Sequence, residues 1–323
     1  MSPLPPADRL ARLRAGATFA TDGGLETVLI FHEGLDLPHF AAFDLLRTQD
    51  GTARLRAYYE PYLRLAVDRG VGFVLETPTW RASPDWAERL GLGEGELEET
   101  LCAAVRLAEE LRAEHETDRT PVLISGNLGP RGDGYDASTR VPAAEAERYH
   151  GIAVRAFAAA GADLVTALTM THVEEAVGIV RAAVAHDLPV VISFTVETDG
   201  RLPGGEALPA AIEQVDAETG RAPLHYLINC AHPSHFDAVL RAGGAWVERV
   251  GGLRANASTR SHAELDEADT LDEGDPVELA AGYAALRPLL PHAAVIGGCC
   301  GTDVRHVERA LDAWLGAGRG APA

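Results

Sequence analysis

Residues 162–194 read ADLVTALTMTHVEEAVGIVRAAVAHDLPVVISF and contain two short apolar runs on either side of a helical pattern. The runs at 162–169 and 188–194 predict two strands, and the stretch at 171–187 between them predicts a helix. Continuous apolar strands are typical of parallel strands that are buried on both faces. These 33 residues therefore predict one strand–helix–strand unit of a parallel sheet.

The same alternation recurs along the rest of the chain. Six more strands are predicted at 18–24, 70–77, 121–127, 223–229, 247–256 and 293–298. Further helices are predicted at 52–70, 142–161 and 234–244, and the first two end in a glycine, a common helix stop. Eight strands alternating with helices predict an α/β fold of the (β/α)₈ TIM-barrel type. A doubly wound sheet is the alternative, but the first strand lacks a GxGxxG turn.

Length and charge narrow the class of protein. The chain has 323 residues and no evident linker, so we expect one domain over residues 1–323. Its formal net charge of −20 disfavours nucleic acid and anionic membranes as partners. We find no secretory signal and no apolar stretch long enough to span a membrane, and we expect a cytoplasmic protein. The sequence allows a homo-oligomer but contains no coiled-coil heptads. The acidic segment at 262–276 is predicted to be a long loop above the barrel mouth.

Three of the four cysteines directly follow predicted strands. Cys230 comes after the sixth strand, and Cys299 and Cys300 come after the eighth. Because the C-terminal ends of barrel strands share one face, these three thiols are expected to converge. Three thiolates can hold Zn²⁺ and leave a fourth position open. We therefore predict a zinc site at the C-terminal ends of strands six and eight, and we predict that Cys102 is a small buried side chain in a helix.

Several motifs resemble those of the homocysteine S-methyltransferase family, from about Phe19 to about Trp314. The most specific are NC at 229–230, GGCCGT at 297–302 and DGGLET at 22–27. Weaker matches are ETPTWRAS at 76–83, SGNLGPRGDGY at 125–135 and SFTVETDGRLPGG at 193–205. The resemblance implies that Cys230, Cys299 and Cys300 are the zinc ligands. It also implies that Asp22 and the backbone around Gly23 and Gly24 hold an amino-acid substrate.

The resemblance further implies a reaction between two small molecules. A methyl group would pass from an onium donor (S-methylmethionine, S-adenosylmethionine or betaine) to a zinc-bound homocysteine thiolate, giving methionine. The chain has no room for the extra domains of relatives that use folate and cobalamin, which favours an onium donor. Aromatic faces suit such a cation. The candidates near the mouth are Phe40, Phe43, Trp80, Trp86 and Tyr135.

One block departs from the family pattern. Many members carry a glutamate after the fourth strand that binds the amino group of the substrate, whereas this chain has Leu168 or Thr169 there. Glu76 can replace that carboxylate, or Glu174 can reach back. Alternatively, the acceptor is another thiol or selenol that lacks the amino group. The candidate substrate-binding residues are Asp22, Gly23, Gly24, Glu76, Thr77, Asn127, Leu168 and Thr169.

Four polar residues near the predicted zinc site also have expected positions. We expect His235 to cap the helix after strand six, His232 to face the pocket, Asn256 to line it and Asn229 to contact the zinc site. Outside methyl transfer, the cysteine pair is compatible with a redox or zinc-buffering protein. A metal-dependent barrel hydrolase is disfavoured because all the candidate ligands are sulfur.

Overall fold

The computed structural model describes residues 4–134, 138–268 and 270–316 and forms a closed barrel. Its strands pair in chain order, every pair is parallel, and β1 closes the ring against β8. They are β1 (Phe19–Ala20), β2 (Gly72–Glu76), β3 (Val122–Leu128), β4 (Leu164–Met170), β5 (Val190–Phe194), β6 (Tyr226–Asn229), β7 (Val250–Ala255) and β8 (Val295–Gly298). The predicted (β/α)₈ barrel is confirmed, and the doubly wound alternative is wrong because that sheet would be open.

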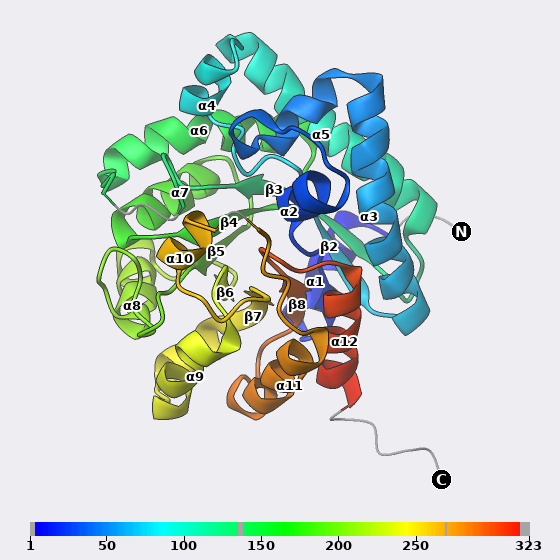
Figure 1. The fold of residues 1–323 in the computed structure, drawn as a ribbon. Helices are drawn as coiled ribbons and strands as arrows, with labels where there is room; N and C mark the ends of the chain where they lie inside the picture. The colour runs from blue at the N-terminus through cyan, green and yellow to red at the C-terminus, as the bar shows by residue number, and fades with distance from the viewer. Residues whose placement is uncertain (1–3, 135–137, 269, 317–323) are drawn as a thin grey trace.

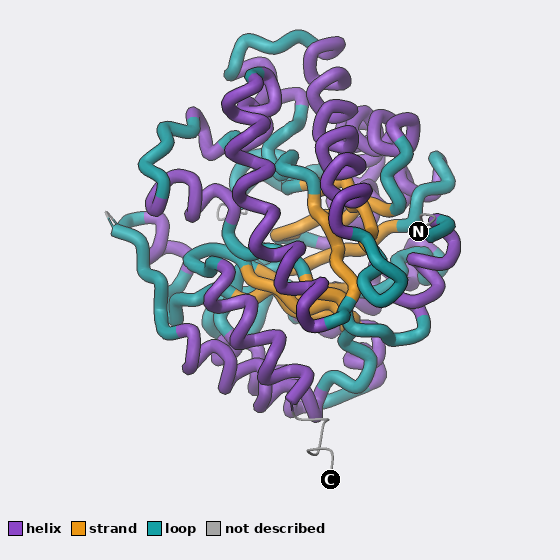
Figure 2. Tube along the Cα trace, turned by 90° about the vertical axis from the view of Figure 1, so that its right-hand side faces the viewer, coloured by secondary structure: helices purple, strands orange, loops and turns teal. Residues whose placement is uncertain are grey.

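The helices form an outer layer around the strands (Figures 1 and 2). One long helix follows each strand: α3 (Gln49–Arg69), α5 (Glu94–His115), α6 (Ala143–Ala160), α7 (Val173–Ala185), α8 (Leu208–Thr219), α9 (Pro233–Ala242), α11 (Pro276–Leu286) and α12 (Val304–Gly316). Shorter elements are α1 (Pro6–Arg14), α2 (Leu25–Thr27), α4 (Pro84–Arg89), α10 (His262–Asp266), η1 (Val28–His32), η2 (Pro38–Phe40), η3 (Ala42–Arg47), η4 (Ala245–Arg249) and η5 (Arg287–Leu289). Among the described residues, no helix combines the length and apolar character needed to cross a membrane.

The strands are mostly apolar because each is covered on both faces, and their polar residues gather toward the C-terminal ends. Val74, Leu123 and Val191 belong to a small cluster inside the barrel. Phe73, the neighbour of Val74, belongs instead to the large cluster between the strands and the helices, as the alternation of side chains along a strand requires. Leu13 of α1 joins the small cluster, so this helix closes the N-terminal end and leaves the C-terminal end for a site.

The acidic stretch after β7 lies over the open end of the barrel, as predicted, but it is not entirely loop. Ser261 begins helix α10 with a capping box, in which its hydroxyl accepts from the Glu264 amide and the Glu264 carboxylate accepts from the Ser261 amide. We call residues 256–275 the β7–α11 segment. Leu265 and Leu271 of this segment line the cavity at the C-terminal end of the barrel, so the segment forms part of its wall.

We predict that Tyr283→Phe destabilises the barrel by about 1–3 kcal/mol, because it leaves buried polar groups without a partner. The buried Tyr283 hydroxyl donates to the Gly297 carbonyl at 2.5 Å and accepts from the Ala255 amide at 2.8 Å. It therefore ties α11 to both β7 and β8. Urea unfolding measures the change. Val277→Ala, at an exposed position of the same helix, is the control, and equal midpoints for the two variants would contradict the prediction.

Candidate functional site

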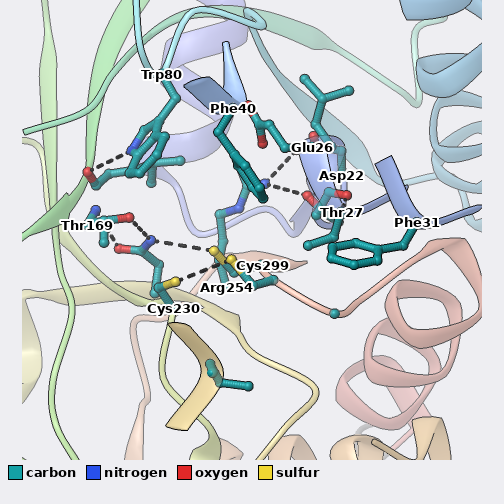
Figure 3. Close-up of a pocket in the computed structure, with 18 of the residues that line it drawn as sticks. Asp22, Glu26, Thr27, Phe31, Phe40, Trp80, Thr169, Cys230, Arg254 and Cys299 are labelled. Carbon is teal, nitrogen blue, oxygen red and sulfur yellow. Dashed lines mark hydrogen bonds and ion pairs between the residues drawn. The ribbon is translucent and has the colours of Figure 1, made fainter. Parts of the chain in front are cut away.

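Three cysteine thiols meet at the C-terminal end of the barrel. The ligand-capable atoms of Cys230, Cys299 and Cys300 all lie within 4.8 Å of one another, and the Cys230 and Cys300 sulfurs are 3.6 Å apart. Cys230 is buried and has a left-handed backbone (φ 55°), while Gly301 (φ 74°) makes the turn after the pair. The loops after β6 and β8 thus bend back toward one point, as Figure 3 shows for Cys230 and Cys299.

This donor set suits zinc. Three thiols within reach of one ion, without a fourth protein ligand in the described cluster, match a zinc site that keeps one position for a substrate. Hydrogen bonds with Cys230 and Cys300 hold the pKa of Cys299 well below its usual range, and the positive charge of Arg254 acts in the same direction against burial. A lowered thiol pKa favours the thiolate form that metals bind.

Asn229 and His262 hold the cysteine loops in place. The Asn229 Nδ2 atom donates to the Cys299 sulfur at 3.7 Å and to Thr169 Oγ1 at 2.8 Å. The expected contact of Asn229 with the cysteine site is therefore present. His262 Nε2 lies 2.6 Å from the Cys230 carbonyl oxygen, and its Nδ1 lies 3.0 Å from Glu197. Sequence reasoning missed His262, which stands 32 residues after the cysteine that it contacts.

The turn after β1 packs directly on the cysteine loop. A Cβ atom at Gly24 would lie 2.7 Å from the Cys299 carbonyl oxygen and 2.2 Å from Thr27 Oγ1, so only glycine fits there. The Gly24 amide donates to the Thr302 carbonyl at 2.9 Å. Asp22 and both glycines line the cavity beside the cysteines.

Arg254 is a buried cation in the floor of the site that sequence reasoning did not single out. Its Nη2 donates to Asp22 Oδ1 at 2.7 Å, its Nε donates to the Gly298 carbonyl at 3.0 Å, and its Nη1 lies 4.0 Å from Glu76 Oε1. Burial lowers the pKa of Arg254, but attraction to Asp22 and Glu76 outweighs burial and raises it. The sequence signal that could have identified Arg254 is the single arginine in the otherwise apolar strand VGGLRA.

The wall formed by β2, β3 and β4 carries the remaining predicted residues. Glu76, Thr77, Asn127, Leu168 and Thr169 all line the same cavity, which measures about 320 Å³. Glu76 Oε2 and Asn127 Oδ1 are buried and have no hydrogen-bond partner within the described ranges. Burial raises the pKa of Glu76 to about 7, although Arg254 opposes the shift.

Thr77 and Thr169 are already engaged with the protein. Thr77 Oγ1 accepts a hydrogen bond from the backbone N–H of Asn127 at 3.0 Å, so Thr77 holds the end of β3. Thr169 adopts φ 64° at an irregularity in β4, and its amide donates to Asn229 Oδ1 at 2.9 Å. Neither Leu168 nor Thr169 brings a charge to this wall.

Of the carboxylates near the site, Glu174 does not reach the cavity as the sequence analysis allowed, and Glu26 does. Glu174 is exposed on α7 and is not among the cavity residues, so it does not reach back. Glu26, in the DGGLET turn, lines the cavity instead. Burial raises the pKa of Glu26 to about 7, and Asp22 adds to the shift. Sequence reasoning missed Glu26, although it lies inside a quoted motif.

Two of the predicted aromatic residues reach the cavity. Phe40 and Trp80 line it, and in Figure 3 both lie above the cysteine sulfurs. Phe31, which was not predicted, also lines it and is 45% exposed. Phe43 and Trp86 do not line it: both are buried in the surrounding structure. Tyr135 lies outside the described residues.

Other predicted roles need correction. His232, not His235, caps α9, because its Nδ1 accepts from the Ser234 amide at 3.2 Å. His235 is buried with its Nε2 2.9 Å from the Thr259 carbonyl oxygen. Asn256 is buried but is not among the residues that line the cavity. Cys102 is half-buried in α5 rather than fully buried.

Comparison with known proteins decides the family. A model of the homocysteine S-methyltransferase family matches residues 20–314 of the chain. The chain belongs to the homocysteine S-methyltransferase family. This membership makes it a methyltransferase and favours methyl transfer to a thiol over the redox, zinc-buffering and hydrolase alternatives.

Solved structures of one family member share this fold. The oxidized form of the homocysteine methyltransferase MmuM from Escherichia coli is 20% identical, with a TM-score of 0.72 and coverage of 95% of this chain and 99% of MmuM. The metallated form of MmuM is 18% identical, with a TM-score of 0.70 and coverage of 94% and 98%. No curated protein matches the sequence.

We predict that Arg254→Met destabilises the protein by about 3–5 kcal/mol, because it leaves Asp22 buried without its cation. The double variant Asp22→Asn with Arg254→Met removes both charges and is expected to lose less stability than the single variant. Chemical denaturation measures the free energy of unfolding of the wild-type protein and of each variant. Arg241→Met, which breaks an exposed pair with Asp237, is the control and is expected to change little. A double variant less stable than the single one would contradict the prediction.

Proposed function

We propose that this enzyme transfers a methyl group from an onium donor to the thiol of homocysteine, giving methionine, and that it requires Zn²⁺. The observation that carries the proposal is the convergence of the Cys230, Cys299 and Cys300 sulfurs beside a cavity of about 320 Å³. Family membership supports the reaction class, and three sulfur donors suit zinc better than harder metals.

Cys230, Cys299 and Cys300 are the residues that would hold the ion. Bound there, zinc would bring the acceptor thiol to its thiolate form at neutral pH. Asn229 would fix the Cys299 sulfur through its Nδ2 atom. We place the enzyme in the cytoplasm, because a reducing compartment keeps such free cysteines available for metal binding.

We assign the amino group of the acceptor to Glu76. Glu76 Oε2 and Asn127 Oδ1 are buried acceptors that have no hydrogen-bond partner among the described residues, and both side chains line the same cavity. An ammonium group is a donor that suits both. Asp22, which also lines the cavity, adds negative charge. These contacts would compensate for the missing carboxylate at Leu168. The proposed acceptor-binding residues are Asp22, Gly23, Gly24, Glu76, Thr77, Asn127, Leu168 and Thr169.

The donor would occupy the aromatic side of the cavity. Phe40 and Trp80 line the cavity, and their rings would attract the positive onium group. Alignment of the methyl group between the donor heteroatom and the acceptor sulfur is then the main task of the protein. S-methylmethionine, S-adenosylmethionine and betaine are the candidate donors.

The alternative keeps this chemistry and changes the acceptor to another thiol or selenol. Leu168 carries the alternative, because the wall formed by β4 presents an apolar side chain where an amino group would require a charge. A thiol without an amino group needs no charged partner at this wall, so Leu168 does not weaken its binding.

Methyl transfer by the zinc-loaded protein tests the proposal. We expect methionine from homocysteine with at least one of the three donors, measured by mass spectrometry. Removal of zinc by a chelator is expected to abolish product formation, because the acceptor would then remain a thiol. Cys299→Ala is expected to lose both bound zinc and turnover, while Cys102→Ala, in α5, keeps both. Full zinc and full activity in Cys299→Ala would refute the proposal. The absence of methionine with every donor would transfer the assignment to the alternative acceptors.

We predict that homocysteine binding weakens as the pH falls below 7. Only the ionised form of Glu76 attracts an ammonium group. The pKa of Glu76 is about 7, so each pH unit further below 7 reduces the ionised fraction of Glu76 about tenfold. Calorimetric titration measures the affinity of homocysteine relative to 4-mercaptobutyrate, which lacks the amino group. Taking this ratio removes the pH dependence of the thiol itself.

Glu76→Gln is the matched variant for this prediction. It keeps the shape of the side chain and removes the charge, so it should lower the homocysteine preference about 10-fold at pH 8 and flatten its pH dependence. An unchanged preference in this variant would remove Glu76 from the acceptor site.

A further inference from the structure

Arg81 is a second cation on the cavity and has no part in the roles assigned above. It follows β2, lines the cavity, and has a side chain only 10% exposed. Its guanidinium carbon lies 4.1 Å from the ring centroid of Trp86 and 5.0 Å from that of Trp80. Two tryptophans thus hold the guanidinium group beside the aromatic side of the cavity.

Most of the hydrogen-bonding capacity of Arg81 is unused. Its Nη2 donates to Asp133 at 3.2 Å. Its Nε and Nη1 atoms are buried without a hydrogen-bond partner in the part of the chain that the structure describes. Buried N–H groups without acceptors are costly. A guanidinium group offers its N–H donors in a fork that suits a carboxylate, so these atoms point to an anionic group on a ligand.

The charges on this side of the cavity narrow the ligand class. Phe40 and Trp80 line this side of the cavity, where aromatic rings attract a cation, and Glu26 and Asp133 add carboxyl groups to the same cavity. Arg81 would repel a donor that carries positive charge alone, and it would attract one that also carries a carboxylate. A zwitterion with an onium group and a carboxylate satisfies all of these groups together.

We propose that Arg81 binds the carboxylate of a zwitterionic methyl-onium donor and so determines donor specificity. The proposal rests on the proposed function. In the transfer, the bond between the methyl carbon and the onium atom breaks and its electron pair stays on that atom. An electron pair of the acceptor thiolate forms the new carbon–sulfur bond, and the proton was lost when the thiolate formed. The former onium atom becomes a neutral thioether or amine, so the demethylated donor leaves carrying the negative charge of its carboxylate, which Arg81 holds throughout. The thiol proton passes to solvent.

Two sulfonium probes that differ in the carboxylate test the proposal. Dimethylsulfonioacetate carries one, and trimethylsulfonium does not. Isothermal titration of the zinc-loaded wild-type protein should show about 10- to 100-fold tighter binding of dimethylsulfonioacetate, the range expected for a charge-assisted contact. Arg81→Ala should reduce this preference to about 3-fold or less, and Arg81→Lys should restore part of it.

Arg89→Ala is the matched control. Arg89 also lies over the Trp86 ring, at 4.3 Å, but it is exposed and does not line the cavity. It should keep the full preference. Equal affinity of the wild-type protein for both probes, no binding of either, or a preference that survives Arg81→Ala would overturn the proposal.

Methyl transfer to homocysteine, measured separately, distinguishes the two proposals. Transfer without a carboxylate preference removes the role of Arg81 and leaves the function intact. A preference that depends on Arg81, without transfer, keeps the binding site and removes the function.

Discussion

The buried ion pair between Arg254 and Asp22 joins the strand ends on which the site is built. Arg254 belongs to β7, Asp22 follows β1, and the Gly298 carbonyl that Arg254 also binds ends β8. One guanidinium group therefore fixes three strand ends. Cys299 and Cys300 follow Gly298 directly, so the positions of both sulfurs depend on this contact. Because an unpaired charge here would be costly, Asp22 and the cysteine loop cannot move independently.

Asn229, which pairs with Arg254 in the register of β6 and β7, provides a second connection to the cysteine loop. Its side chain receives hydrogen bonds from the Thr169 amide and the Ser193 hydroxyl and donates to the Cys299 sulfur. It thereby links β4, β5 and β6 to the loop after β8. Thr169 and Cys230, two of the residues brought together here, have positive φ angles. Such conformations carry a cost for residues other than glycine, and the surrounding hydrogen bonds maintain them.

The barrel and its cysteine cluster were predictable because each depends on a pattern in the sequence. Strands buried on both faces appear as apolar runs, and the ends of parallel strands share one rim, which brings Cys230 to Cys299 and Cys300. The Arg254–Asp22 pair was not predicted, because the apolar strand pattern does not show which residue at the rim a charged strand residue contacts. Helix α10 and the His232 cap could have been predicted from local sequence signals. These signals were the Ser261–Glu264 capping box and Pro233 at the start of α9.

Side chains at the mouth were the least predictable part of the site. Phe40 and Phe43 are three residues apart, yet one lines the cavity and the other is buried in the core. Their directions are set by η2 and η3, two short helical turns that the apolar pattern did not reveal. Glu26 and Arg81 are pocket residues for the same reason: irregular turns, rather than a strand or helix period, decide where their side chains point.

The β7–α11 segment has a mechanical consequence for the enzyme. It supplies Leu265 and Leu271 to the cavity wall, and its His262 binds the carbonyl oxygen of Cys230. Any displacement of α10 that widens the exit must therefore break or carry along a contact on the cysteine loop. We therefore expect opening of the cavity and loosening of the sulfur cluster to occur together. Passage of small molecules through the mouth and retention of the proposed zinc ion would then both depend on the contact between His262 and Cys230.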